Sequence, residues 1–145
     1  MVIAGEWVCD EDNVVRPYLW AHVTLPDGQD IHERFIVDSG ADCCQLSYRL
    51  LVRLGIDVTA GGMRHALVGV GGRADLILIA AKLVFETMDG RTITVDGPYL
   101  GSTDPAALDL SFLGRDVLAN FDLILSRRRN EVLVLGGQHT YAVTG

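Results

Sequence analysis

The sequence predicts an all-β domain built as a barrel or a sandwich, with little helix. Short stretches suited to β-strands follow one another along the chain, and turns rich in Gly, Pro or Asp separate them. No internal repeat, low-complexity segment or interdomain linker interrupts the 145 residues. A chain of this length buries one core of ordinary size, so we expect a single domain over residues 1–145.

The first half of the chain predicts a hairpin and then a short helix. Residues 18–25 alternate and stop at Pro26-Asp27-Gly28, which is a strong turn signal. Residues 31–37 then resume as the partner strand. Residues 47–54 carry leucines at helical spacing and stop before Gly55, which suits the end of a helix.

The second half predicts more strands, with one further helical segment. Residues 76–85 are apolar enough to form one central strand, and Met88-Asp89-Gly90-Arg91 is a turn into a strand at 92–95. The sequence then indicates a loop, a short helix and a last hairpin. These elements are expected over 101–109, over 113–118, and over 121–125 with 131–135.

The charge and the hydrophobic pattern exclude two classes of partner. The net charge of −7 argues against nucleic acid, whose binding depends on basic patches. The one basic run, Arg127-Arg128-Arg129, falls between two predicted strands and is interpreted as a solvated turn. The longest apolar run covers residues 76–81 and is far too short to cross a bilayer, so we expect no membrane partner.

The cysteines and the start of the chain favour a cytoplasmic location. Three cysteines do not form a closed set of disulfides, and the neighbours Cys43 and Cys44 lack metal-site spacing. The stretch Met1–Glu6 has no basic region and reaches an acid too soon for a signal peptide. The four histidines are scattered without metal-ligand spacing, so we expect surface histidines and no metal.

Three motifs stand out. The apolar stretch Phe35-Ile36-Val37 delivers the chain to Asp38, and Ser39-Gly40-Ala41 follows at once. A buried ionised carboxylate costs several kcal/mol unless it is paired or hydrogen-bonded, so such a strand end calls for an explanation. The second motif is Gly69-Val70-Gly71-Gly72, and the third is Phe112-Leu113-Gly114-Arg115-Asp116.

Taken in this order, the three motifs resemble those of the retropepsin family, the single-lobe aspartic proteases of retroviruses and their cellular and bacterial relatives. The resemblance covers about residues 18–136. It implies a closed acid-protease barrel with one short C-terminal helix, and a homodimeric aspartic endopeptidase that needs no cofactor and acts on a peptide or protein substrate. In this family two aspartates, one from each subunit, share a proton because two ionised carboxylates in contact repel too strongly. One carboxylate then activates a water, while the protonated one polarises the scissile carbonyl.

The resemblance also gives each residue of the first motif a role. Asp38 matches the catalytic aspartate, and Ser39 matches the hydroxyl residue that forms hydrogen bonds across the dimer. Gly40 matches the residue whose carbonyl accepts a hydrogen bond from the substrate backbone. Ala41 completes the loop that supports the site.

The other two motifs imply a flap and an ion pair. The glycine-rich motif matches the hairpin that closes over the substrate, so Gly69, Val70, Gly71 and Gly72 are expected to form a mobile tip that binds it. Asp42 matches an aspartate near the substrate backbone, and Arg115 matches the arginine that pairs with it, in a partly desolvated position. The residues expected to line the pocket or its floor are Val37, Leu67, Val70, Leu78 and Leu113.

Two departures from the family pattern and several alternatives stay open. Cys43-Cys44 replaces a more polar pair and would alter the polarity of the pocket. Residues 1–16 extend before the family core, which leaves the geometry of the dimer open. Asp38 also suits an ordinary turn, the glycines an ordinary hairpin, and Asp42 with Arg115 a purely structural ion pair. The alternative function is a non-catalytic peptide-binding or dimerisation module that kept the fold.

Overall fold

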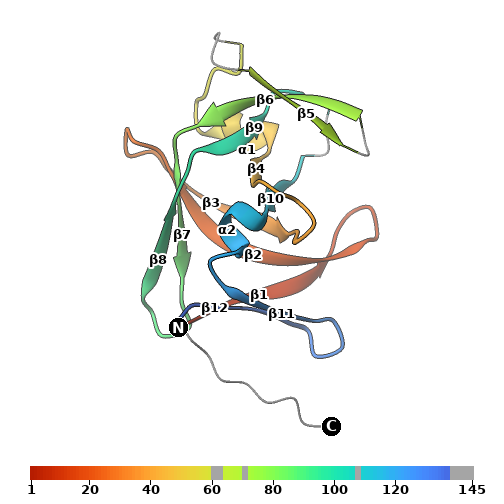
Figure 1. The fold of residues 1–145 in the computed structure, drawn as a ribbon, viewed down its shortest axis with the longest axis vertical. Helices are drawn as coiled ribbons and strands as arrows, with labels where there is room; N and C mark the ends of the chain where they lie inside the picture. Colours follow the sequence, from red (N-terminus) through yellow and green to blue (C-terminus); the bar gives the residue numbers. More distant parts are fainter. Residues whose placement is uncertain (60–63, 70–71, 107–108, 138–145) are drawn as a thin grey trace.

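The computed structural model describes residues 1–59, 64–69, 72–106 and 109–137; of residues 64–69 and 72–74 it describes the backbone only. This part of the chain contains twelve strands and two short helices (Figure 1). None of its helices is long and apolar enough to cross a membrane. The helices are α1 (Tyr48–Arg53) and α2 (Arg115–Leu118). The strands are β1 (Val2–Cys9), β2 (Val15–Thr24), β3 (Asp30–Val37), β4 (Gln45–Leu46), β5 (Arg64–Gly69), β6 (Gly72–Ile79), β7 (Lys82–Glu86), β8 (Thr92–Asp96), β9 (Tyr99–Ser102), β10 (Ser111–Leu113), β11 (Asp122–Ser126) and β12 (Glu131–Leu135).

The strands are linked in one hydrogen-bonded path, so the predicted all-β fold is confirmed. The path runs β11-β12-β1-β2-β3-β10-β4-β9-β6-β5, and β7 pairs with β2 and β8. In Figure 1 the β5–β6 hairpin lies at one end of the molecule and β1, β11 and β12 lie at the other. Within the described residues the end strands β11 and β5 do not pair with each other, so the path is open.

The predicted hairpin over residues 18–37 is present as β2 and β3. Its register runs from Tyr18 opposite Ile36 to Thr24 opposite Asp30. Gly28 has a positive φ of 89°, which suits glycine in the connecting turn. The alternate β2 residues Leu19, Ala21 and Val23 are buried, so the alternating sequence pattern does mark the inner face.

Strand β10 enters between two consecutive strands of the chain and thereby positions the site. It pairs in parallel with β3, with Phe112 opposite Ile36 and Leu113 opposite Val37. On its other side β10 pairs antiparallel with β4, where Phe112 lies opposite Gln45. Because parallel strands end at the same edge of a sheet, the chain leaving β3 and the chain leaving β10 emerge side by side.

Helix α1 follows β4 and begins where the sequence places it. The side chain of Ser47 accepts a hydrogen bond from the backbone N–H of Leu50, which caps the helix. Gly55 follows the helix with a φ of 68°, as a C-terminal glycine should. The leucines at 50, 51 and 54 are fully buried and pack into the core.

Three parts of the chain differ from the sequence-based expectation. The single strand predicted over 76–85 is two strands, because the chain changes neighbours between Ile79 and Lys82: β6 pairs with β9, and β7 pairs with β2 and β8. The loop predicted over 101–109 begins two residues late, since Gly101 and Ser102 belong to β9. The N-terminal extension contributes β1, which pairs with β12 along Val2–Gly5 and with β2 along Glu6–Cys9.

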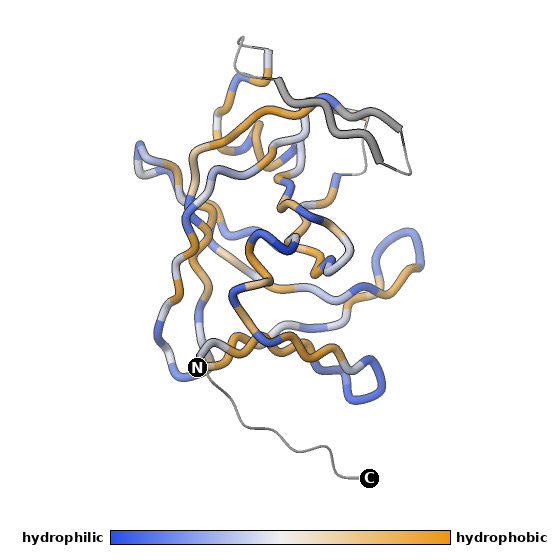
Figure 2. The backbone as a smooth tube through the Cα atoms, viewed as in Figure 1, coloured by the Kyte–Doolittle hydropathy of each residue, from blue (hydrophilic) through white to orange (hydrophobic). Residues whose placement is uncertain are grey.

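The core lies inside the folded sheet, and its buried side chains are almost all apolar. Figure 2 shows hydrophobic stretches along the strands and hydrophilic ones at most turns. Fully burying one large apolar side chain stabilises a fold by about 1.5–3 kcal/mol, so these side chains hold the sheet layers together. The largest fully buried side chains are Tyr18, Phe35, Phe85, Leu19, Leu46, Leu50, Leu51, Leu54, Leu76, Leu83, Leu113 and Val23.

Candidate active site

Asp38 lies directly after the buried end of β3. Its backbone N–H donates to the carbonyl oxygen of Leu113 at 3.0 Å, which continues the β3–β10 pairing by one residue. Its Oδ1 accepts the backbone N–H of Gly40 at 2.9 Å. Asp38 therefore begins a turn of the kind that aspartates favour. This agrees with the alternative that Asp38 suits an ordinary turn.

Asp38 is half-buried in the single chain. The full burial that the resemblance implies depends on a second chain and stays a prediction. No Lys, Arg or His side chain in the described part of the chain forms an ion pair with it. The strand delivers Asp38 to the surface of the single chain, because Val37 is the last residue that the core covers.

The residues after Asp38 form a tight and exposed turn. Ser39 and Gly40 are exposed, and Ala41 donates its backbone N–H to the carbonyl oxygen of Asp38 at 3.2 Å. A β-carbon on Gly40 would lie 3.1 Å from Asp38 Oδ1, so a side chain at this position would crowd the carboxyl group. The hydroxyl of Ser39 and the carbonyl of Gly40 are thus placed where another molecule could reach them.

Helix α2 binds the other side of this loop through its first residues. The N–H of Arg115 donates to the carbonyl oxygen of Ala41 at 2.9 Å, and the N–H of Asp116 donates to that of Asp42 at 3.1 Å. The first N–H groups of a helix have no partner within the helix, so the loop carbonyls satisfy them. Gly114 allows the two backbones to approach this closely.

Asp42 and Arg115 form the expected ion pair within one chain. Arg115 Nη2 donates to Asp42 Oδ1. The two side chains are 79% and 58% exposed in the single chain. The partly desolvated setting that the resemblance implies belongs to the dimer cleft and stays a prediction. Water screens an exposed pair, so it contributes about 0–1 kcal/mol to the stability of the fold.

Cys44 and Asp116 make a contact that the sequence did not reveal. Cys44 is fully buried, and its backbone N–H lies 2.9 Å from both carboxylate oxygens of Asp116. Its thiol Sγ lies 2.8 Å from Asp116 Oδ1. Burial, followed by the bond to Asp116, raises the pKa of the Cys44 thiol far above its usual range, so the thiol stays protonated. The only sequence signal was the position of Asp116 at the end of the third motif.

Cys43 has a different environment from its neighbour. It is exposed, and all three cysteines of the chain are free thiols. The expected change in pocket polarity therefore concerns Cys43 alone, because the Cys44 side chain belongs to the interior. The Cys44 thiol lacks the activated, low-pKa setting of a nucleophilic cysteine.

The glycine-rich motif lies at the turn of the β5–β6 hairpin. These strands are antiparallel, and Gly69 lies opposite Gly72. Val70 and Gly71 lie outside the described residues, as does the side chain of Leu67. The prediction that Val37 and Leu113 line the pocket is wrong for the single chain, because both side chains are buried in the core. Leu78, also predicted to line it, is 38% exposed.

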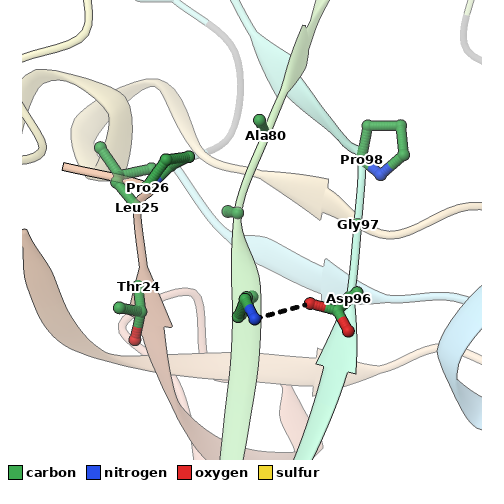
Figure 3. Close-up of a pocket in the computed structure, with 9 residues that line it drawn as sticks. Thr24, Leu25, Pro26, Ala80, Asp96, Gly97 and Pro98 are labelled. Carbon is green, nitrogen blue, oxygen red and sulfur yellow. Dashed lines mark ion pairs between the residues drawn. The ribbon is translucent and has the colours of Figure 1, made fainter. Parts of the chain in front are cut away.

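The apolar hollow in Figure 3 is not at Asp38. It has a volume of about 420 Å³ and lies where β6 passes into β7 and β8 passes into β9. Lys82 Nζ and Asp96 Oδ1 form an ion pair 3.3 Å long across its wall (Figure 3). Its lining residues are Thr24, Leu25, Pro26, Ala80, Ala81, Lys82, Asp96, Gly97 and Pro98. Within the described residues, no group of three or more His, Cys, Asp or Glu side chains could hold a metal ion.

A strand-end aspartate, a Ser-Gly turn and a crossing strand that leads into Gly-Arg-Asp come together at this site. The family model for aspartyl proteases matches residues 21–117. This match covers most of the chain and includes both Asp38 and Arg115. The chain belongs to the aspartyl protease family.

The first of two similar solved structures shows the same fold. A retropepsin-like aspartic protease from Rickettsia conorii is 20% identical, with a TM-score of 0.53, and the match covers 92% of this chain and 88% of that one. The retroviral protease-like domain of Ddi1 from Leishmania major is 24% identical, with a TM-score of 0.47, over 81% of this chain and 94% of that one. Among curated proteins, none matches the chain significantly. The fold is therefore retropepsin-like, as the motifs indicate.

Proposed function

We propose that this chain is a homodimeric aspartic endopeptidase whose active site pairs the Asp38 carboxyl groups of two subunits. The observation that carries the proposal is the placement of Asp38 at the half-buried end of β3 without a cationic partner among the described residues. The chain has a single Asp-Ser-Gly sequence, and the chemistry needs two carboxyl groups. A twofold axis beside Asp38 supplies the second group from an identical chain.

The proposed reaction is hydrolysis of a peptide bond by an activated water. One ionised Asp38 removes a proton from the water, and the water oxygen attacks the scissile carbonyl carbon. The protonated Asp38 of the other subunit donates to the carbonyl oxygen, which gives a tetrahedral diol. The C–N bond then breaks as the first carboxyl returns a proton to the amine nitrogen, and the second recovers its own.

The substrate in this proposal lies extended between the Asp38 loop and the β5–β6 hairpin. An extended peptide binds through backbone hydrogen bonds and alternating side chains, as an added strand does. Gly40 and Asp42 are exposed residues of this loop, and the Gly40 carbonyl is proposed to accept a hydrogen bond from the substrate backbone. The hairpin stretch Gly69, Val70, Gly71 and Gly72 is the proposed cover. Ser39, exposed in the single chain, is proposed to form hydrogen bonds across the dimer with Ala41 supporting the loop.

The proposed location is cytoplasmic, where the thiols stay reduced. Cys9 and Cys43 are exposed free thiols, which suit a reducing compartment. No nucleic acid is an expected partner, because the chain carries a net charge of −7.

The experiment is cleavage of a peptide library by the purified chain between about pH 4 and 7, followed by mass spectrometry of the products. The matched control is Asp38→Asn, which keeps the size and one acceptor oxygen of the side chain but cannot ionise. We expect cleavage by the wild-type chain and none by the variant. Equal cleavage by both chains would contradict the proposed site.

The alternative is a peptide-binding module that does not cleave. It predicts that wild-type and Asp38→Asn chains bind the same library peptides and release them intact. Binding without cleavage by a chain shown to be dimeric would favour this module over the enzyme.

A further inference from the structure

The Asp38 loop is attached to the segment Leu113–Asp116 at both of its ends. At the start of the loop, Asp38 donates its N–H to Leu113, 3.0 Å away. At its end, Cys44 binds Asp116 through two groups, a backbone N–H and a thiol. Between these ends Ser39, Gly40, Asp42 and Cys43 are exposed. The middle of the loop is held by backbone bonds to α2, from the N–H of Arg115 to Ala41 and from the N–H of Asp116 to Asp42.

The thiol of Cys44 joins two groups of the α2 segment to each other. It accepts the backbone N–H of Gly114 at 3.1 Å and points its own hydrogen to Asp116 Oδ1 at 2.8 Å. A thiol is a weak donor, but here its acceptor is a carboxylate and the side chain is fully buried. Asp116 Oδ1 also accepts the N–H of Val117 at 3.0 Å, which fixes the carboxylate at the start of the helix.

We propose that Cys44 and Asp116 are positioning residues, which together fix the loop that carries Asp38. This inference rests on the proposed function. Neither side chain lies in the exposed turn that would face a substrate, so neither is a catalytic residue in this account. Their effect reaches the reaction through the loop, because Cys44 anchors the end of the segment that Asp38 begins. Loss of the thiol removes its bonds to Gly114 and Asp116, which weakens the attachment of the loop at Cys44 and lets the Asp38 carboxyl shift relative to its partner.

The sharpest test compares Cys44→Ala with Cys44→Ser. Alanine and serine leave a similar gap at this buried site, but only the serine hydroxyl can accept from Gly114 and donate to Asp116. We expect Cys44→Ala to lower kcat about tenfold or more with little change in KM, since small displacements of a reacting group are costly. Cys44→Ser should restore kcat to within about threefold of the wild type, because it re-forms both hydrogen bonds.

The matched control is Cys9→Ala, which removes an exposed thiol at the end of β1, outside the Asp38 loop. It should leave kcat and KM within about twofold of the wild type, as surface changes usually do. Asp116→Ala should cost more than Cys44→Ala, because it also removes the acceptor of the Cys44 backbone N–H. The double variant should lose little beyond Asp116→Ala alone, because the contact between thiol and carboxylate is already gone.

Hydrogen exchange supplies a readout that does not need activity. In Cys44→Ala the amides of residues 38–44 should exchange about tenfold faster, while those of β2 keep their wild-type protection. If the wild-type chain cleaves no peptide, the proposed function fails, and the exchange difference between the Ala and Ser variants still decides whether Cys44 holds the loop. Wild-type kcat and loop exchange in Cys44→Ala would overturn the proposal. Equal impairment of the Ala and Ser variants would overturn it too, because that result assigns the effect to the lost volume.

Discussion

Gly114 lies so close to Cys43 that a β-carbon on Gly114 would stand 2.5 Å from the carbonyl carbon of Cys43 and 2.6 Å from its carbonyl oxygen. The atoms in the way belong to the backbone, which cannot rotate aside as the end of a side chain can. The contact joins the start of α2 to the Asp38 loop. A glycine at position 114 is therefore a requirement of packing, since its φ of −96° is open to any residue.

We expect Gly114→Ala to destabilise the fold by about 1–3 kcal/mol, the usual cost of forcing an extra carbon into a packed site. The measurement is urea unfolding of the variant and the wild type, followed by circular dichroism. The Asp38 loop should be displaced as well, so peptide cleavage should fall more steeply than stability. A variant within about 0.5 kcal/mol of the wild type would show that the two backbones are not in contact.

Arg115→Ala should affect the stability of the single chain and the dimerisation of two chains to different extents. Because the ion pair with Asp42 is exposed, the variant should change the unfolding free energy of the isolated chain by less than about 1 kcal/mol. If a second subunit covers the pair, as the proposed dimer implies, the variant should weaken dimerisation and activity together. Asp42→Asn should have the milder effect, because it leaves no uncompensated carboxylate beside Asp38.

The measurement for Arg115 is sedimentation equilibrium over a range of concentrations, with Arg115→Lys as the comparison. Lysine keeps the charge but not the planar fork that matches a carboxylate, so it should restore only part of the dimer. A large loss of stability in the monomer, with dimerisation unchanged, would contradict this prediction.

Glu33 should give the fold a pH dependence of its own. Its side chain is 8% exposed, lies 3.1 Å from Arg53 Nη1 and accepts the hydroxyl of Ser111 at 3.3 Å. Burial raises the pKa of Glu33, although Arg53 opposes the shift. A carboxyl whose pKa is higher in the folded state stabilises the fold most below its unfolded value of about 4.3. That contribution is lost as the pH rises through the folded value.

The measurement for Glu33 is the unfolding free energy of the wild type and of Glu33→Gln at steps between about pH 4 and 8. The unfolding free energy of the wild type minus that of the variant should fall as the pH rises, because the variant lacks the buried group that must ionise. Glu86→Gln, at an exposed position on β7, should show no such trend. A difference that grows with pH would mean that Arg53 outweighs the burial of Glu33.

The local parts of this fold are predictable because local chemistry determines them. The hairpin over residues 18–37 follows from a Pro-Asp-Gly turn between two alternating stretches, and α1 follows from Ser47 and Gly55 at its ends. The break between β6 and β7 is not predictable, since both halves of the apolar run contribute buried residues and only their partner strands change. A hydrophobic pattern predicts which residues are buried, but it does not predict which strand pairs with them.

The candidate site divides in the same way. The three motifs predicted the Asp38 turn, the glycine-rich hairpin and the contact between Asp42 and Arg115. The burial of that pair in the proposed dimer stays a prediction, because it depends on which surfaces of two chains face each other. The bond between Cys44 and Asp116 was missed because it joins positions 72 residues apart through a side chain that rarely acts as a donor.

The central claim, two Asp38 carboxyl groups in one active site, is tested most directly by mixing subunits. Wild-type and Asp38→Asn chains are unfolded together in equal amounts and refolded, and peptide cleavage is then measured per wild-type chain. Random pairing leaves about one quarter of the dimers with two Asp38 residues, so activity per wild-type chain should fall to about half. The control is the same variant refolded separately and added just before the assay, which should cause no loss. Unchanged activity per wild-type chain after joint refolding would show that each chain works alone and would contradict the paired site.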